Sequence, residues 1–432
     1  MAPLVFSTKS GAHCANERIV FLDLKAFSTY RLPLALISLL FLLWGFGHSF
    51  IDVLNSHMEQ AFHTTKAQAA SVHLMIYGGH LLAALPAGLL VKRLGYKRGI
   101  LWGLLLYGLG ALLFVPASFS DNGFALTLPA LFIVGYGLGS LEVAANPYVA
   151  LLGSPEGAAQ RMNMAQAFNG LGLMMGPIIG GFLLYGTATT AHPHEHELHA
   201  AHDMGGAAVA YAVLGLSALA IAAVFAFLRL PKAEDKESGA EEVKGLVAEW
   251  RHILKQSDFR IAMIALFLCV MAQTGLNSVF VYYASSPSVG FSRAGAAEML
   301  GGICMVLLLA GRFVGSYLLR RVKPERMVRL SGLIALFFTM SAVVLPGKWG
   351  LMCVFGIYLS ESVLYPTIFA VAVTHTHYNA GMASSLLELC VVGGAIAPVL
   401  MGYVADVSSP ALSLAIPVAC FAAIVVSMRR LS

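Results

Sequence analysis

Four carboxylic acids lie inside long apolar runs of this sequence: Asp52, Glu142, Glu361 and Glu388. Glu142 stands in the middle of LTLPALFIVGYGLGSLEVAANPYVALL, and Asp52 stands near the end of PLALISLLFLLWGFGHSFIDVLN. If these runs cross a bilayer, each ionised group at that depth costs about 2.5–3.5 kcal/mol. A membrane helix that keeps such a group generally uses it to bind a ligand or carry a proton, so these acids are the first candidates for function.

The composition indicates a membrane protein with many spans. Of the 432 residues, 58% are hydrophobic and 11% are charged, and the mean hydropathy is +0.77. Ordinary soluble domains are about 25% charged. Long uninterrupted apolar runs indicate helices, because the strands of a membrane barrel are shorter and alternate in polarity. All cysteines except Cys14 lie in apolar runs, which argues against a disulfide framework.

The hydropathy pattern predicts an all-α integral membrane protein with twelve transmembrane helices in two pseudo-symmetric six-helix halves. The predicted spans are residues 32–55, 68–91, 99–117, 125–151, 162–185, 207–228, 259–284, 295–319, 327–345, 349–374, 381–404 and 410–428. Around them, the predicted organisation is a cytoplasmic tail (1–31), an N-terminal bundle (32–228), a charged cytoplasmic linker (229–258) and a C-terminal bundle (259–432).

The distribution of basic residues supports both the span count and the orientation. If both termini are cytoplasmic, nearly all of the 27 Lys and Arg residues fall on the cytoplasmic side. Only Lys66, Arg293 and Lys348 fall on the other side, and Arg312 lies within a span. This is the excess of positive charge expected in cytoplasmic loops. The sequence therefore predicts a multi-pass protein of the cell (inner) membrane with both termini in the cytoplasm.

The two halves echo each other. GLLVKRLGYKRGI follows the second span, and GSYLLRRVKPERMV follows the eighth. Glu142 lies five residues before Pro147 in the fourth span, and Glu361 lies five residues before Pro366 in the tenth. Internal repeats of this kind are typical of secondary transporters, whose site lies near midplane between the repeats.

Several segments are similar to those of the fucose–proton symporter family, within the major facilitator superfamily. They are FLLWGFGHSFIDVLN, YGLGSLEVAANPYVALLG, RMNMAQAFNGLG with GPIIGG, and YPTIFAVAV, in that family's order, and the resemblance covers about residues 35–428. The loop GLLVKRLGYKRG resembles the superfamily's motif after the second helix, with Lys92 where an aspartate is common.

The resemblance implies the major facilitator fold and the import of hexoses, deoxyhexoses or N-acetylhexosamines with protons. It implies that Asp52 handles the proton and that Glu142 contacts the sugar and responds to protonation. His48 and Ser49 stand where some members have asparagines, so we count His48 among the candidates for sugar contact. Glu361 and Glu388 are acids where typical members have none, which bears on the substrate more than on the mechanism.

Amide side chains could supply further sugar contacts, since they both donate and accept hydrogen bonds. Asn146 follows Glu142 by four residues and shares its helix face. The competing interpretation for each amide is hydrogen bonding between helices, which is common in membranes. Tyr365 could stack on a pyranose, beside the helix break that Pro366 predicts. The other amide candidates are Asn163, Gln166, Asn169, Gln273 and Asn277.

The two remaining acids allow different roles. Glu388 and Arg312 lie at similar predicted depths, which suggests an ion pair that is either structural or part of a gate. Glu361 lies near midplane, where it could link to a proton, contact a cationic or amino sugar, or stay protonated within the bundle.

Two groups of histidines raise further options. The loop AHPHEHELHAAHD, within residues 191–203, offers weak metal binding or a mobile polar loop, and its spacing matches no fixed metal site. His73 and His80 are seven residues apart on one helix face, so they could line the pore, relay protons or pack between helices. We predict no metal site.

The leading functional hypothesis is import of a sugar with protons by alternating access. The alternatives are a proton-coupled antiporter that exports drugs or cationic compounds, and a sugar sensor that does not transport. An enzyme is not expected, because no nucleophile elbow, phosphate loop or metal motif occurs in a water-facing segment. We expect a monomer in the bilayer with no cofactor besides H⁺ as coupling ion and no nucleic-acid partner, and both the sugar and the choice of H⁺ or Na⁺ stay open at this point.

Overall fold

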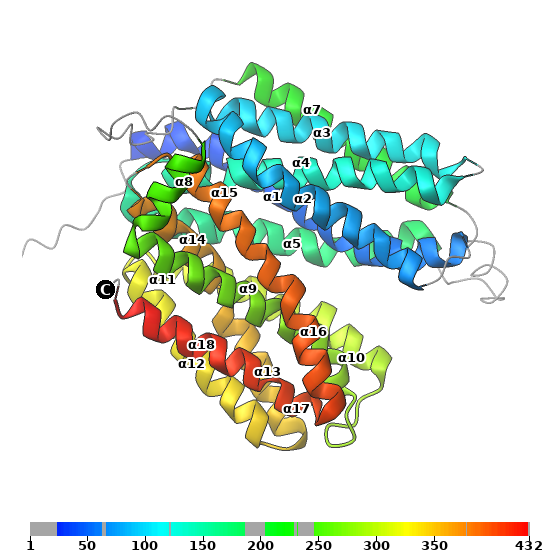
Figure 1. The fold of residues 1–432 in the computed structure, drawn as a ribbon, viewed down its shortest axis with the longest axis vertical. Coiled ribbons are helices and arrows are strands. Elements are labelled where there is room, and N and C mark those ends of the chain that lie inside the picture. Colours follow the sequence, from blue (N-terminus) through cyan, green and yellow to red (C-terminus); the bar gives the residue numbers. More distant parts are fainter. Residues whose placement is uncertain are drawn as a thin grey trace, which may run out of the picture.

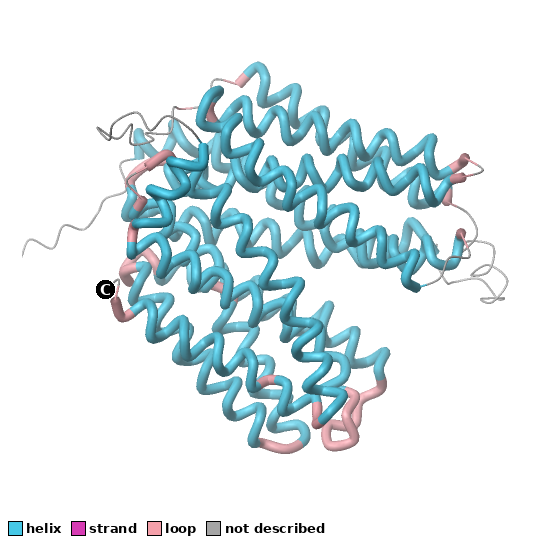
Figure 2. The backbone as a smooth tube through the Cα atoms, viewed as in Figure 1, coloured by secondary structure: helices cyan, strands magenta, loops and turns pink. Residues whose placement is uncertain are grey.

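The computed structural model describes the backbone of residues 24–62, 66–120, 122–185, 204–228, 231, 246–376 and 378–430. Every regular element in these ranges is a helix (Figure 2). Eleven stretches are long and apolar enough to cross a membrane. The fifth predicted span corresponds to α5, a helix of 28 residues, which at 1.5 Å per residue is also long enough to cross.

The helices before the charged segment form one bundle. They are α1 (Leu24–Ala61), α2 (Lys66–Leu94), α3 (Tyr96–Ser118), α4 (Gly123–Leu151), α5 (Ala158–Tyr185) and α7 (Gly205–Phe227). We call this bundle the N half. A short helix, α8 (Leu246–Lys255), follows it inside the segment predicted as a linker.

The helices after α8 form the second bundle, the C half. They are α9 (Ser257–Ala284), α10 (Arg293–Met299), α11 (Met305–Leu318), α12 (Pro324–Val344), α13 (Gly347–Glu361), α14 (Leu364–His375), α15 (Ala380–Glu388), α16 (Val392–Val407), α17 (Pro410–Ser413) and α18 (Ala415–Met428). The two halves lie together at the end that carries α8 and the last described residues, and they diverge toward the other end (Figure 1). We call the first end the α8 side.

Four predicted spans of the C half are interrupted rather than continuous, the twelfth span at Leu414, between α17 and α18. The eighth contains a π-helical turn at Leu300–Cys304, and the eleventh contains a 3₁₀ turn at Leu389–Val391 directly after Glu388. The tenth is broken at Ser362 and Val363, between α13 and α14. Pro366 accounts for this last break, because proline has no N–H and its ring clashes with the carbonyl four residues earlier, which is that of Ser362.

Two boundaries differ from the predictions. The first helix begins at Leu24, inside the stretch predicted as a tail, because LKAFSTY continues the helix without a glycine or a stop signal. Part of the predicted linker is the helix α8, on which Glu249 and Ile253 are buried. Glu249 pairs with Lys92 at the end of α2, which attaches α8 to the N half.

Small residues bring α2 and α15 together across the two halves on the α8 side. A Cβ atom added at Gly88 would lie 2.7 Å from Ser385 Cβ, and one added at Gly381 would lie 2.6 Å from Val91 Cγ1. Lipid is as apolar as a leucine side chain, so membrane helices associate through such close packing rather than through a hydrophobic force. We call this contact the α2–α15 seam.

Replacing Gly88 with valine should separate the halves on the α8 side. Overpacking of this kind costs about 1–3 kcal/mol, and the cost applies only in the conformation where α15 lies against α2. Spin labels at Leu94→Cys and Arg321→Cys, both exposed on this side, should then report a longer distance than in the parent chain. Gly402→Val is the matched control, because a Cβ at Gly402 meets nothing within 4 Å. An unchanged distance in Gly88→Val would contradict the role of the seam.

Candidate functional site

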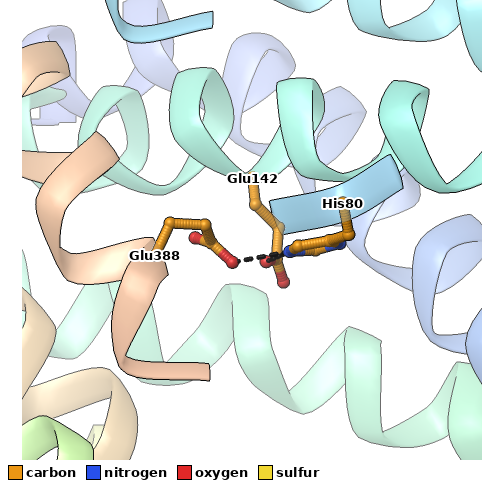
Figure 3. Close-up of side chains that lie close together, drawn as sticks. All are labelled: His80, Glu142 and Glu388. Carbon is orange, nitrogen blue, oxygen red and sulfur yellow. Dashed lines mark hydrogen bonds and ion pairs between the residues drawn. The ribbon is translucent and has the colours of Figure 1, made fainter. Parts of the chain in front are cut away.

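One histidine is held between two carboxylates that belong to different halves (Figure 3). The Nε2 atom of His80 lies 2.8 Å from Glu142 Oε2 and 2.7 Å from Glu388 Oε1. His80 is on α2, Glu142 on α4 and Glu388 at the end of α15. All three residues are buried, with exposed fractions of 6%, 5% and 1%. We call these three residues the central cluster.

Close helix packing positions the central cluster. A side chain on Gly139 would collide with the backbone carbonyl of His80, so this glycine lets α4 approach α2 at the level of the histidine. Glu142 follows Gly139 by three residues, so it lies on the same face one turn further along. On α15, Glu388 follows Ser385 by three residues and so continues the face that packs on Gly88.

The depth of the central cluster follows from its place on α2. His80 lies twelve residues before Lys92, which marks the end of the helix. At 1.5 Å per residue this is about 18 Å along the helix, near the middle of a hydrocarbon core about 30 Å thick. The cluster therefore lies where an uncompensated charge would be most costly.

The geometry restricts the protonation states of the cluster. While both carboxylates are ionised, the ring nitrogen between them carries a hydrogen, since a lone pair there would be repelled by both oxygens. The donor atoms of all three residues lie within 4.8 Å of one another. Two carboxylates this close resist simultaneous ionisation unless a cation lies between them, and His80 in its protonated form supplies such a cation.

The same three residues are, among those described, the group whose atoms could hold a metal ion. The N–O separations of 2.7 and 2.8 Å are those of charge-assisted hydrogen bonds. The arrangement described here is therefore that of a hydrogen-bonded group.

A second polar group lies within the C half. Glu361, at the end of α13, is 1% exposed, and neither of its oxygens has a hydrogen bond of regular geometry. Its polar neighbours are the Gln273 amide and the Arg312 guanidinium. The positive charge of Arg312 thus acts on Glu361 without an ion pair between them. We call these three residues the C-half cluster.

Tyr365 lies between the two clusters. It is within electrostatic reach of Glu142 and Glu388 on one side and of Arg312 on the other. It is half-buried and stands just after the break that Pro366 causes. The prediction that Pro366 would interrupt this span is confirmed, and the break brings Tyr365 to the level of both acidic groups.

The predicted ion pair of Arg312 with Glu388 is not formed. Both residues belong to the described part of the chain, and there Glu388 pairs with His80 while Arg312 Nη1 donates a hydrogen bond of 2.5 Å to the Gln166 carbonyl of the N half. The prediction rested on equal depth, but α15 turns Glu388 toward α2 and α4, whereas α11 turns Arg312 toward α5.

Three of the predicted sugar-contact amides make hydrogen bonds between helices. Asn163 Nδ2 donates to Thr367 Oγ1 of the C half at 2.9 Å. Asn169 Nδ2 donates to the Phe41 carbonyl at 3.3 Å, and Asn277 Oδ1 accepts from the Tyr358 hydroxyl at 2.8 Å. At these positions the structure favours the helix–helix interpretation for the atoms concerned.

Other predicted contacts keep buried polar atoms without a hydrogen-bond partner. They are Nδ2 and Oδ1 of Asn146, Nε2 of Gln166 and Oδ1 of Asn163. Asn146 is fully buried, and Gln166 is 3% exposed. His48 on α1 interacts with the hydroxyl of Tyr77, one turn before His80 on α2, at 3.0 Å. Buried polar groups without partners are uncommon in proteins, which makes these atoms candidates for contact with a polar ligand.

Three predictions fall outside what the structure describes. The backbone of Asp52 lies in α1, but its side chain is not among the described ones. The same holds for the side chain of His73, and the histidine-rich loop lies wholly within residues 186–203. The roles predicted for them stay predictions.

Comparison with known proteins gives a consistent family assignment. The model of a family described as Major Facilitator Superfamily matches residues 37–398. A glucose/galactose transporter of Brucella abortus (strain 9-941) is 34% identical over 398 residues, which cover 91% of this chain and 92% of that protein. The L-fucose-proton symporter of Escherichia coli (strain K12) is 31% identical, with 96% of both chains covered.

Solved structures agree in fold. The structure of the major facilitator transporter FucP in the outward conformation superposes with a TM-score of 0.83 at 30% identity, covering 94% of this chain and 99% of that chain. The proton:xylose symporter XylE superposes with a TM-score of 0.71 at 13% identity, over 94% of this chain and 96% of that one, which shows the fold alone.

Removing the shared cation should destabilise the protein. His80→Ala leaves two carboxylates buried without their partner, and breaking a buried pair in this way costs about 3–5 kcal/mol. We expect a lower Tm in detergent, partly restored in the double variant His80→Ala/Glu388→Gln, because one of the two orphaned charges is then absent. Additive losses in the double variant would show that the two residues do not interact.

Proposed function

We propose that this chain, which belongs to the major facilitator superfamily and within it to the fucose–proton symporter family, imports a sugar together with protons by alternating access. The observation that carries the proposal is the central cluster, in which ionisable groups of both halves share hydrogens at mid-membrane depth. A group of this kind can be charged in one conformation and neutral in another, as proton coupling requires. The names of the relatives, a glucose/galactose transporter and an L-fucose-proton symporter, support a neutral sugar as cargo.

The proposed setting is the cell (inner) membrane, with the α8 side in the cytoplasm and the protein acting as a monomer. The excess of Lys and Arg in the loops of that side supports this orientation. The conformation described here then has its halves together on the cytoplasmic side and apart on the outer side (Figure 1). Its similarity to FucP in the outward conformation supports the same assignment.

Sugar contacts are proposed at polar groups that the protein itself leaves unsatisfied. In the N half these are Asn146 and Gln166. In the C half the group is Glu361, beside Gln273 and Arg312. A sugar hydroxyl both donates and accepts, so carboxylate oxygens and amides suit it, and Tyr365 between the clusters can offer a ring face. Polar contacts to a sugar of this kind fix its orientation within a largely apolar site.

Export of drugs or cationic compounds is less well supported. The C half does contain a buried acid, but Arg312 lies beside it and offsets its charge. A cation would meet both charges at that position, whereas a neutral hydroxyl can bond to either.

Sugar exchange in proteoliposomes is the direct test. The purified protein should exchange a labelled sugar in counterflow, with glucose, galactose, fucose and an N-acetylhexosamine as the panel. Glu361→Gln should weaken or change the preference among these sugars, because the amide replaces an acceptor by a donor. Glu298→Gln, a substitution on the surface of α10, is the control and should leave the preference unchanged. Failure of the parent chain to exchange any of the sugars would overturn the proposal.

Asp52 is the proposed partner of Glu142 in handling the proton. Asp52→Asn should abolish sugar accumulation and leave counterflow intact, because exchange at equal proton potential needs no net proton movement. One proton that moves down 100 mV releases about 2.3 kcal/mol, which sustains roughly fifty-fold accumulation. Accumulation should therefore fall to unity in liposomes with an imposed potential. Accumulation equal to that of the parent chain would remove Asp52 from the coupling mechanism.

A further inference from the structure

We propose that Glu388 is an additional proton-coupling residue, which in its ionised form holds the two halves together on the α8 side through His80 and on protonation releases them. The proposal deepens the proposed function, on which it rests for the direction of transport. It assigns to the C half a part in proton coupling, alongside the acids of the N half. It also gives His80 a definite role as the cation that both halves share.

The His80–Glu388 contact differs in kind from the rest of the α2–α15 seam. Nearer the α8 side, the seam consists of Gly88 against Ser385 and Val91 against Gly381, which are contacts of small and apolar groups. These contacts are insensitive to pH. Glu388 Oε1 at 2.7 Å from His80 Nε2 adds an ion pair to the same seam, between residues 308 positions apart in the chain. The seam therefore contains a bond whose strength depends on a proton.

The position of the proton decides whether the halves attract each other. With both carboxylates ionised, protonated His80 binds Glu142 within the N half and Glu388 across to the C half. A proton on Glu142 leaves the pair between the halves intact. A proton on Glu388 instead leaves the pair His80–Glu142 inside the N half, with no net charge, and ends the attraction across the seam. Of the two carboxylates, only Glu388 releases the halves when it is protonated. The Glu142 carboxylate then stays buried beside its partner, His80.

Protonation of Glu388 shifts the conformation in the direction that inward symport requires. The ionised form of Glu388 is stabilised only while α15 lies against α2, so ionisation favours the conformation described here. Protonation shifts the population toward the conformation in which the α8 side separates. An unprotonated empty carrier would return to the present conformation, which resets the cycle. Linkage makes the two effects reciprocal, since a proton and an open α8 side each favour the other.

Few other titratable groups face Glu388. Besides His80 and Glu142, the neighbours within electrostatic reach are Tyr365 on α14 and Cys390 in the adjoining 3₁₀ turn. Tyrosine and cysteine side chains keep their protons between pH 5.5 and 7.5. His375 at the end of α14 and His252 on α8 can also change charge in this range, so only a pH response that Glu388→Gln and His80→Gln abolish belongs to the central cluster.

The distance between the halves on the α8 side tests the proposal. Spin labels at Leu94→Cys and Arg321→Cys, in a chain whose native cysteines are replaced, should report a short distance at pH 7.5. A longer distance should gain population as the pH falls to 5.5. Glu388→Gln, which cannot ionise, should show the longer distance at both pH values. His80→Gln, which cannot form the ion pair, should lose the pH response in the same way and serves if Glu388→Gln does not fold.

A matched control exists within the C half. Glu325 on α12 pairs with His375 at the end of α14, at 3.4 Å, so this Glu–His pair does not connect the two halves. Glu325→Gln should therefore keep the pH response of the parent chain. A parent distance that does not change with pH, or a Glu388→Gln variant with the parent response, would overturn the proposal.

Sugar counterflow measured on the same proteins separates the two hypotheses. If the distance responds to pH as expected but no sugar is exchanged, the cargo proposed above is wrong and the role of Glu388 stands. If sugar is exchanged but Glu388→Gln keeps both the parent distances and the parent pH profile of uptake, the role of Glu388 is wrong and the proposed function stands.

Discussion

A carboxylate removed from water needs a cation, a proton or several hydrogen-bond donors beside it, and this requirement organises the interior of the molecule. Glu142 and Glu388 meet it together, by sharing His80. Glu361 has no hydrogen bond of regular geometry to either oxygen within the described part of the chain but lies near Arg312, whose guanidinium donates to a carbonyl of the N half. His80 thus pairs with Glu388 across the two halves, and Arg312 also bonds across them through the Gln166 carbonyl. The conformation of the bundles and the ionisation of these groups are consequently coupled.

Such compensation works only if the helices approach closely enough. Gly139 lets α4 lie against the backbone of α2 at His80, and Gly88 lets α15 lie against α2 further toward the α8 side. A larger residue at either position would move the carboxylates away from the imidazole. Since a charge-assisted hydrogen bond weakens steeply when its atoms are drawn apart, the small residues of the seam determine the electrostatics of the site. The glycines thus set the distances between the helices, and the ionisable groups make the contact between these helices sensitive to pH.

Much of the fold follows from the sequence, because lipid imposes strict requirements on length, apolarity and loop charge. The depth of Glu142 and Glu361 was predictable for the same reason, and so was the break at Pro366. The residues that pair with these acids were not predictable from the sequence. Depth gives one coordinate of a side chain, whereas its direction around the helix and the identity of the facing helix come from the packing of the two halves. Arg312 and Glu388 share a depth and face different helices, while His80 and Glu388 meet from 308 residues apart. The small residues Gly88, Gly381 and Ser385 were the available signal that α2 and α15 approach each other.

The amides illustrate the same limit at smaller scale. Asn163, Gln166 and Asn169 are three residues apart and share a helix face, but this spacing does not say which of their atoms bond to neighbouring helices. Asn163 and Asn169 each donate a hydrogen bond to another helix, whereas Nε2 of Gln166 has no partner. One face of this helix therefore carries both amide atoms that bond to other helices and amide atoms that have no partner.

The two halves of the internal repeat also differ in the helices that carry their corresponding acids. Glu142 and Glu361 each lie five residues before a proline, yet α4 runs through Pro147 without interruption while the corresponding span of the C half breaks before Pro366. In the continuous helix, Glu142 is held rigidly against His80, which suits a group that must exchange a proton at fixed distance. At the break, Glu361 ends its helix with both oxygens unsatisfied, and Tyr365 begins the next one. An irregular backbone of this kind is tolerated in a membrane where it is enclosed by protein or lines a cavity. Corresponding elements of the two repeats thus present their acids differently, the N half from a continuous helix and the C half from the end of a broken one.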